Sequence, residues 1–356
     1  MAGQTIESPI PKDECASYRD SFAKELYNRL FNWLVKRLNF TTVPSECIKD
    51  GAINIPEIIG SPKYYHIGLL DIFGFEIFKS NSLEQFCINY ANERLQQLYI
   101  TYVFKSEEKE FVNEGLKEYF AQIKFKDNQN LIDMLDRVNP VGIFQRIDEY
   151  SSINSNDQAL LDKIIKDFRQ PGYPFSVPRT AKDSFIIQHT AKDVEYTITG
   201  FRVKNKDELS TAIQEIVNTA SFPEVVKIWK YICGNEKEPE QKTLKLNPKD
   251  KFLGYKFRTQ MRELMDELNS CQCHFVRCIR ANDKKEAGLF HPALVLQQIK
   301  YMGILDTLKV RKESFPVRRP YRVFYERYGD LDPELSKISF QEHIAKGADF
   351  RGMTQK

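Results

Sequence analysis

Residues 64–96 read YYHIGLLDIFGFEIFKSNSLEQFCINYANERLQ, an apolar run followed by a short mixed step and a long periodic segment. The run at 64–70 is short and mostly apolar and follows Pro62, which predicts a strand buried on both faces. From Ser82 to Glu110 apolar residues recur at helical spacing without Gly or Pro, which predicts one long helix. The strand and the helix are joined by the step that carries the first chemical signal in the chain.

That step is Asp71-x-x-Gly74, placed at the end of the predicted strand. In P-loop nucleotidases an Asp at a strand end lies near Mg²⁺, and a Gly shortly after it can present its backbone N–H to the γ-phosphate. Gly is needed there because a side chain would keep the backbone away from the phosphate. The four-residue pattern is weak alone, since about one match is expected by chance in a chain of this length.

Outward from this stretch, the remaining pattern is also mixed helix and strand. Helical periodicity predicts helices at 21–38, 131–135, 142–147, 160–165, 257–268 and 294–311. We expect the first of these to bury one apolar stripe, and the last to break near Gly303. Strands are predicted at 194–200, which alternates with period two, and at 274–279. Residues 234–251 are the most loop-like stretch and end in a Lys cluster.

Composition excludes several classes of protein. With 356 residues, 42% hydrophobic and 28% charged, the chain matches an ordinary globular protein of about two domains. Its 25 Phe, 17 Tyr and 2 Trp are too many for a disordered chain. No apolar run reaches the length of a membrane span, and the first residues do not resemble a secretory signal. The 52 basic and 49 acidic residues sum to +3, which argues against a DNA- or RNA-binding protein.

The seven Cys are best read as reduced thiols. Cys271 and Cys273 stand next to His274, but no second ligand pair stands at zinc spacing, so a metal site is not favoured. Asn39-Phe40-Thr41 matches a glycosylation sequon by pattern only.

The longer phrase, 71–76 followed by 81–96, closely resembles the switch II loop and relay helix of the myosin motor head. Other segments resemble the same family in the same order along the chain. They are 19–27, 139–144 with 157–158, 274–282, 296–299, 303–306 and 315–316. The resemblance covers essentially the whole chain and indicates an unconventional myosin heavy chain, represented from before switch II to the start of the converter.

The resemblance implies an α/β fold, an incomplete P-loop nucleotidase-like head with a largely helical actin-binding subdomain. The implied parts are a helix and the switch II strand (1–76), the relay helix (77–111), the actin-binding subdomain (112–233), a basic surface loop (234–253), a central-sheet strand with helices before the converter (254–314), and a partial converter (315–356).

The resemblance also implies roles around the nucleotide. Asp71 is expected near Mg²⁺ through water, with no direct metal ligand in this chain. Gly74 is expected to donate its amide to the γ-phosphate, and Glu76 to pair with an arginine of switch I; these two are the catalytic candidates. The implied cofactor-binding residues are Asp71, Ile72, Phe73, Gly74, Phe75 and Glu76. The implied relay residues are Asn81, Glu84, Gln85, Asn89, Asn92 and Glu93.

The implied actin-binding surface comes from three segments. From the helix-loop-helix come Ile143, Phe144, Asp148 and Glu149. From the basic loop come Lys242, Lys245, Lys249 and Lys251, suited to a salt-sensitive encounter with acidic actin. From the adjoining stretch come Phe257, Arg258, Met261, Leu264, Met265, Leu268, His274, Phe275, Val276, Arg277, Cys278 and Ile279.

The function implied is ATP-driven movement on actin, with ATP and Mg²⁺ as cofactors. The implied partners are F-actin and a light chain bound beyond residue 356, in the cytoplasm on the actin cytoskeleton. The resemblance further implies a regulatory phosphate or acidic residue near Thr5.

The chain departs from the family pattern in several places. None of its 16 Gly belongs to a Gly-x-x-x-x-Gly-Lys-[Ser/Thr] loop, and the switch I segment is missing. We therefore expect this chain alone to lack ATPase activity. Tyr301 and Arg311 replace two family thiols, and the loop at 151–156 is more polar than usual, so actin affinity is expected to differ. The alternative is an ATPase-dead actin-binding module made as this fragment.

Overall fold

The computed structural model describes residues 12–49, 52–53, 63, 65, 67–113, 117–120, 127–153, 155–180, 182–206, 217, 221, 223, 229, 252–302, 308 and 319–331. The described part is mostly helical. Its helices are α1 (Lys12–Thr42), α3 (Leu83–Asn113), α4 (Lys117–Phe120), α5 (Gln129–Asp136), α6 (Ile143–Ser152), α7 (Asp157–Phe168), α8 (Phe201–Asn205), α11 (Leu253–Ser270), α12 (Pro292–Tyr301) and α14 (Tyr321–Tyr328), with 3-10 turns η1 (Ser45–Cys47) and η2 (Gly329–Leu331).

The strands form two small antiparallel sheets. One pairs β1 (Ile48–Lys49) with β2 (Ala52–Ile53), and the other has the order β3 (Phe175–Ser176), β4 (Ser184–Gln188), β5 (Asp193–Thr197). β4 and β5 form a hairpin whose register runs from Ser184 opposite Thr197 to Gln188 opposite Asp193. Alternating burial along β5 confirms the half-buried strand that its period-two sequence predicts.

The chain forms two compact units. The first comprises residues 1–73, 144–162 and 198–259, and the second comprises 74–143, 163–197 and 260–356.

The core of the second unit lies where the start of α3 packs on the three-stranded sheet. Phe86 meets Tyr196 edge to face at 5.5 Å between ring centroids, and Phe185 stacks on Tyr196 at 5.7 Å. All three side chains are fully buried. Such aromatic pairs add about 0.5–1.5 kcal/mol each beyond the area they bury. The same sheet continues the aromatic layer through Phe175, stacked on Phe185 at 5.9 Å.

A buried carboxylate joins three helices of this unit. Asp136, at the end of α5, accepts hydrogen bonds from Tyr90 of α3 and Arg262 of α11, both at 2.8 Å. Arg94 of α3 lies 3.8 Å from the same carboxylate. Because the carboxylate is paired and hydrogen-bonded, its burial is tolerated.

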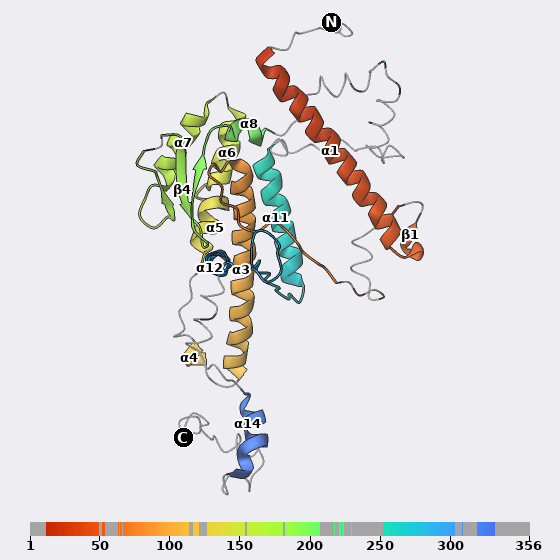
Figure 1. Ribbon diagram of the computed structural model, residues 1–356, viewed down its shortest axis with the longest axis vertical. Coiled ribbons are helices and arrows are strands. Elements are labelled where there is room, and N and C mark those ends of the chain that lie inside the picture. Colours follow the sequence, from red (N-terminus) through yellow and green to blue (C-terminus); the bar gives the residue numbers. More distant parts are fainter. Residues whose placement is uncertain are drawn as a thin grey trace. The chain divides into compact units, whose positions relative to one another are not determined.

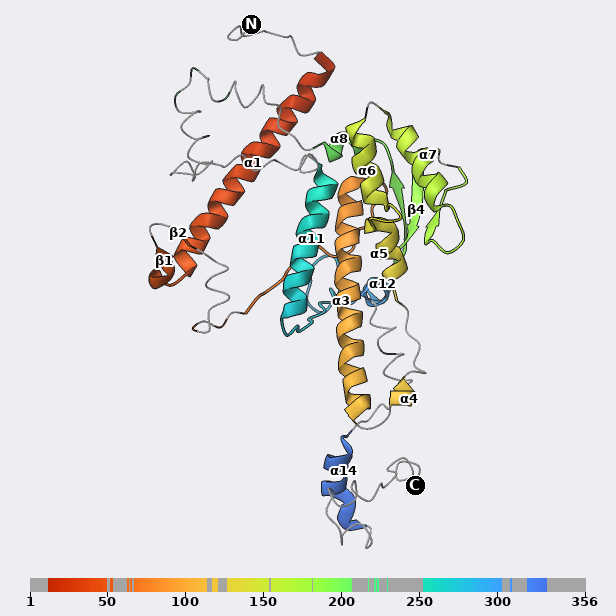
Figure 2. The same ribbon diagram turned by 180° about the vertical axis from the view of Figure 1, so that it is seen from behind.

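In Figure 1, α3 runs as one unbroken helix, and Figure 2 shows it unbroken from behind.

Several predicted helices are confirmed. The long helix from 82 to 110 is α3, the helix-loop-helix is α6 and α7, and the helix at 257–268 is α11. The helix predicted from 294 is α12, which ends at Tyr301, two residues before Gly303. Residues 303–307 lie outside the described part.

The helix predicted at 21–38 is also present, as the longer α1, but its buried stripe is wrong. Leu30, Leu34 and Leu38 are 46%, 46% and 54% exposed. The physical reason is that no described element of the first unit covers this face. Within this unit, Phe22 of α1 stacks on Trp229 at 5.8 Å between ring centroids.

Two predicted strands are not formed by the described residues. Residues 67–70 and 274–279 belong to no strand, and Ile67 and Leu69 are more than nine-tenths exposed. A strand needs a neighbour to pair its backbone groups, and no described segment pairs with either run. The α/β sheet expected around these runs is therefore absent from the described part, which is helix-rich with a small antiparallel sheet.

No helix among the described residues is both long and apolar enough to span a bilayer.

Candidate functional site

Residues 74–76 are tied to α3 by one buried amide. The Glu76 backbone N–H donates to Asn89 Oδ1, and Asn89 Nδ2 donates to the Glu76 carbonyl, both at 2.8 Å. Asn89 is fully buried. The paired bonds form a closed ring between a side chain and the backbone, so Glu76 cannot shift without breaking both or carrying α3 with it.

Residues 74–76 also include a position with free space around it, Gly74. A Cβ built on Gly74 meets no heavy atom within 4 Å, so a bulky group has room to approach this backbone. The Glu76 carboxylate accepts a weak bond from Gln85 Nε2 at 3.4 Å and forms no ion pair with a described residue. Gln85 also accepts the backbone N–H of Ser82, half of a capping box at the start of α3.

The first three residues of the predicted switch, Asp71, Ile72 and Phe73, belong to the first unit and are exposed. Mg²⁺ is usually held by one or two carboxylates together with substrate phosphates and waters. A single exposed carboxylate at Asp71 fits that mode of binding. The described residues contain no group of three or more His, Cys, Asp or Glu that could hold a metal ion.

A second buried network continues from Asn89 across the sheet. Asn89 Nδ2 donates to the Tyr196 hydroxyl at 2.9 Å, and that hydroxyl lies 2.8 Å from His189 Nε2. His189 Nδ1 lies 3.2 Å from Glu93 Oε1. The Glu93 carboxylate also accepts Thr190 N at 2.8 Å and Asn128 Nδ2 at 2.6 Å. A chain of hydrogen bonds therefore runs from Glu76 through Asn89, Tyr196 and His189 to Glu93. It joins Asn89 and Glu93, which lie one turn apart on α3, through the β4–β5 hairpin.

Burial and pairing act in opposite directions on this network. Burial by itself raises the pKa of Glu93, but the bonds and charge of His189, with the bonds of Thr190 and Asn128, lower that pKa below its ordinary value. Burial also raises the pKa of Tyr196, so its hydroxyl stays protonated. The hydrogen bonds to Glu93 thus favour the ionised form of this buried carboxylate.

The remaining relay candidates differ in their hydrogen bonds and exposure. Asn81 is buried and donates to the carbonyls of Phe78 and Glu195, both at 3.0 Å. Asn92 donates to Ile88 of its own helix at 2.9 Å. Glu84 is exposed in the first turn of α3.

Further along, α3 contacts the segment at 274–279. Phe275 packs against Tyr99 at 5.0 Å and Tyr102 at 5.6 Å between ring centroids. Arg277 donates to Gln96 Oε1 at 3.1 Å, and its guanidinium carbon lies 4.8 Å from the Tyr99 ring centre. The segment is irregular, yet its Phe275 and Arg277 side chains contact the helix. Its other members, His274, Val276, Cys278 and Ile279, are exposed.

In the first unit, the predicted actin-binding residues of α6 and α11 meet in a polar centre. Asp148 accepts Arg258 Nη2 at 2.7 Å and Asn205 Nδ2 at 3.0 Å. Asn205 Oδ1 accepts the Gly254 N–H at 2.8 Å. Arg258 and Asp148 are each 6% exposed at the side chain, so this ion pair lies in the interior. One asparagine of α8 thereby joins α6 to α11.

Burial divides the predicted actin-binding residues into two groups. Those that are buried are Ile143, Phe144, Asp148, Arg258, Met261 and Met265. Those at least partly exposed are Glu149, Phe257, Leu264 and Leu268, with the members of 274–279. Lys242, Lys245, Lys249 and Lys251, like Thr5 and Arg311, lie outside the described residues.

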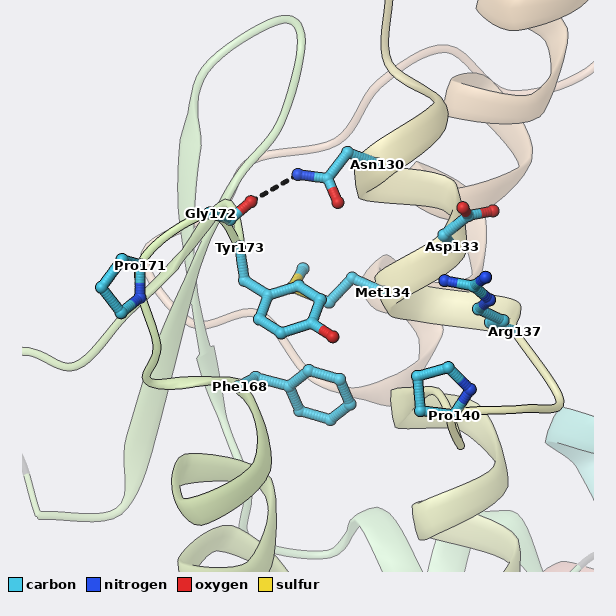
Figure 3. Close-up of a pocket in the computed structure, with 9 residues that line it drawn as sticks. All are labelled: Asn130, Asp133, Met134, Arg137, Pro140, Phe168, Pro171, Gly172 and Tyr173. Carbon is cyan, nitrogen blue, oxygen red and sulfur yellow. Dashed lines mark hydrogen bonds between the residues drawn. The ribbon is translucent and has the colours of Figure 1, made fainter.

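One cavity, of about 290 Å³, lies in the second unit beside α5 (Figure 3). Figure 3 shows Met134, Phe168 and Tyr173 as its apolar lining, with Asp133 and Arg137 on the α5 side. Its full lining is Asn130, Asp133, Met134, Arg137, Pro140, Phe168, Pro171, Gly172 and Tyr173. The side chain of Asn130 closes one edge by donating to the Gly172 carbonyl. None of the residues predicted to act in the site lines this cavity.

Reasoning from the sequence missed several site residues, among them Tyr196, His189, Thr190 and Asn205. The first three lie about a hundred residues from α3 in the chain and reach it only through the β4–β5 hairpin. Asn205 carries no motif at all. A polar residue within a predicted half-buried strand, such as Tyr196, was the one available signal.

Comparison with known proteins places the chain in a family. Residues 1–351 match the family model for the myosin head (motor domain). The chain is 37% identical to Myosin-2B of Naumovozyma castellii over 93% of its length, and 34% identical to the Myosin-I heavy chain of Dictyostelium discoideum, also over 93%. It is 33% identical to the human unconventional myosin-Vc over 96%.

The match covers a small part of each relative. It spans 23% of the yeast protein, 13% of the Dictyostelium protein and 19% of the human protein. The family model, by contrast, covers nearly all of this chain, and the chain therefore belongs to the myosin head (motor domain) family.

Proposed function

We propose that this chain supplies the switch II, relay and actin-binding parts of an ATP-driven, actin-based motor. The observation that carries the proposal is the paired bond between Glu76 and Asn89. It links the residues expected at the γ-phosphate to a helix of 31 residues. A movement of Glu76 on phosphate binding is transmitted to α3 because the two share buried hydrogen bonds.

The nucleotide step rests on residues 71–76. Mg-ATP, when bound, supplies the phosphoryl group that is hydrolysed. Gly74 donates its N–H to the terminal phosphate, and the space around its Cα supports this role. Asp71 holds water toward the metal, and Glu76 pairs with an arginine supplied by a segment outside these 356 residues. The phosphate-binding loop is likewise supplied from outside them.

The α3 helix carries the change away from the nucleotide. Because α3 contacts Phe275 and Arg277, a movement of α3 is passed on to the segment at 274–279. We propose that this segment, with the helices after it, leads toward the converter and a light chain bound further along the heavy chain.

Actin is bound through the helix-loop-helix of α6 and α7, the exposed side chains of α11 and the Lys cluster at 242–251. The buried members, Asp148 and Arg258, support this surface from behind. The partner is filamentous actin, and the place of action is the actin cytoskeleton of the cytoplasm.

The nucleotide part of the proposal is tested by Gly74→Ala in a heavy chain that also carries a phosphate-binding loop. The variant is sterically allowed, because a Cβ at Gly74 meets nothing within 4 Å. We expect ATP turnover to fall by at least about 100-fold, because the added methyl group would keep the phosphate away from the N–H of residue 74 and so weaken one donor contact, while nucleotide-free actin binding survives. Gly68→Ala, equally unobstructed, is the matched control and keeps its turnover. Normal turnover in the Gly74 variant would contradict the switch II assignment.

A second candidate function is an actin-binding module without ATPase activity. The two candidates differ in the native heavy chain. Peptide mapping of the polypeptide that carries residues 234–251 recovers a phosphate-binding-loop peptide if it is a motor, and none if it is a module.

A further inference from the structure

Arg202 of α8 reaches the end of the first actin-binding helix. Its Nε donates to the Tyr150 carbonyl at 2.7 Å, and its Nη2 donates to the Ile153 carbonyl at 3.0 Å. Tyr150 lies in the last turn of α6, where carbonyls have no donor within the helix. The guanidinium therefore caps the C-terminal end of α6 and binds the first residues of the loop that follows.

Residues 200–202 are also hydrogen-bonded to the start of α7. Asp157, the first residue of α7, accepts the Gly200 N–H on Oδ2 at 2.8 Å and the Arg202 N–H on Oδ1 at 3.4 Å. Gly200 has φ of +84°, a left-handed conformation that glycine adopts at little cost. Gly200 and Arg202 are thus hydrogen-bonded to both ends of the loop between α6 and α7.

We propose that Arg202 is a positioning residue for actin binding, fixing the tip of the helix-loop-helix in its binding arrangement. The tip presents exposed side chains, Ser152, Ile153, Asn156 and Gln158, with Ile153 52% exposed. The inference rests on the proposed function, because it takes the filament as the partner of this tip.

Arginine suits this task for a physical reason. Its planar fork donates to two carbonyls at once, whereas a lysine ammonium is a point donor on a flexible stem. Charge-assisted hydrogen bonds are also stronger than neutral ones. A loop held in place before the partner arrives loses less conformational freedom on binding, which raises affinity.

The test is co-sedimentation of the 356-residue chain with filamentous actin, comparing Arg202→Met with Lys206→Met. Both variants remove one positive charge from neighbouring positions, so an electrostatic effect alone weakens binding equally in both. Lys206 is exposed, and its bridge to Phe252 uses backbone atoms that Met retains. We expect Arg202→Met to weaken binding about tenfold, in line with the loss of a charged hydrogen bond, and Lys206→Met less than about twofold. Arg202→Lys is expected to fall between them.

Hydrogen exchange on the same proteins separates positioning from general unfolding. Arg202→Met is expected to speed exchange of the amides at 150–158 while those of α3 keep their protection. Equal losses of actin binding in the Met variants, unchanged binding in Arg202→Met, or faster exchange throughout α3 would each overturn the inference. If the unchanged chain fails to bind actin, the proposed function fails instead, and exchange at 150–158 still reports whether Arg202 holds the loop.

Discussion

At the scale of single residues, Asn89 does what no apolar side chain could do at its position. It is fully buried, yet its amide satisfies the N–H and carbonyl of Glu76 and one bond of the Tyr196 hydroxyl. A buried polar group left without a partner costs about 1–3 kcal/mol. The fully paired amide therefore specifies one arrangement of residues 74–76 against α3.

Glu93 gives this network a predictable response to pH. Its pKa in the folded chain lies below the ordinary value of 4.5 because hydrogen bonds from His189, Thr190 and Asn128 outweigh its burial. Its stabilising contribution is therefore complete above pH 4.5 and is lost as the pH falls through the lowered value. We expect the free energy of unfolding to fall more steeply between about pH 5 and pH 3 in the unchanged chain than in Glu93→Gln.

Urea denaturation across that range measures the difference. Glu263→Gln, which removes the same charge from an exposed position on α11, is the matched control. Parallel curves for the unchanged chain and Glu93→Gln would show that Glu93 is not an ionised, hydrogen-bonded group in the folded chain.

At the scale of helices and strands, the sequence predicted what depends on local pattern. The helices α6, α7 and α11 carry a 3.6-residue apolar period, and β5 alternates with period two, so the burial of each element follows from its own sequence pattern. The α3 helix is predicted instead by its long run without Gly or Pro. The runs at 64–70 and 274–279 are apolar and short, but a strand exists only if another pairs with it. The sequence of such a run does not determine its pairing partner, and neither run forms a strand in the described part.

The candidate site was likewise predictable only where it depends on local sequence. Asn89 and Glu93 stand in a phrase specific enough to be predicted as relay residues. Their partners Tyr196 and His189 could not be predicted, because only the β4–β5 hairpin brings them to α3. The actin-binding candidates were predicted as one class, whereas packing separates buried supports such as Arg258 from exposed groups.

The junction of α6, α8 and α11 predicts the effect of a single methyl group. A Cβ at Gly254 would lie 3.1 Å from both Asn205 Oδ1 and Asp148 Oδ1, and 3.3 Å from Phe144. Both oxygens are held in place, because Asn205 is hydrogen-bonded to Asp148 and Asp148 is in turn hydrogen-bonded to Arg258. Gly254→Ala is expected to lower the free energy of unfolding by about 1–3 kcal/mol, the usual cost of overpacking.

Chemical denaturation of the 356-residue chain checks this value. Gly68→Ala is the matched control, since nothing lies within 4 Å of its new methyl group, and we expect little change there. A stabilised Gly254→Ala would mean that the junction is looser than its hydrogen bonds indicate.

At the scale of the whole molecule, this chain corresponds to between 13% and 23% of the three relatives named above. Within that part it carries a path from residues 74–76 into α3 and, separately, a supported helix-loop-helix. In the proposed function, the first of these serves contact with the nucleotide and the second serves contact with the filament.

The most direct test is co-sedimentation of the 356-residue chain with filamentous actin at low and high salt, with a control spin without actin. We predict that the chain pellets with actin at low salt and dissociates as salt rises, because the Lys cluster and acidic actin attract each other through screened charges. Failure of the folded chain, verified by circular dichroism, to bind actin at low salt would contradict the proposal that its helix-loop-helix and basic loop form an actin-binding surface.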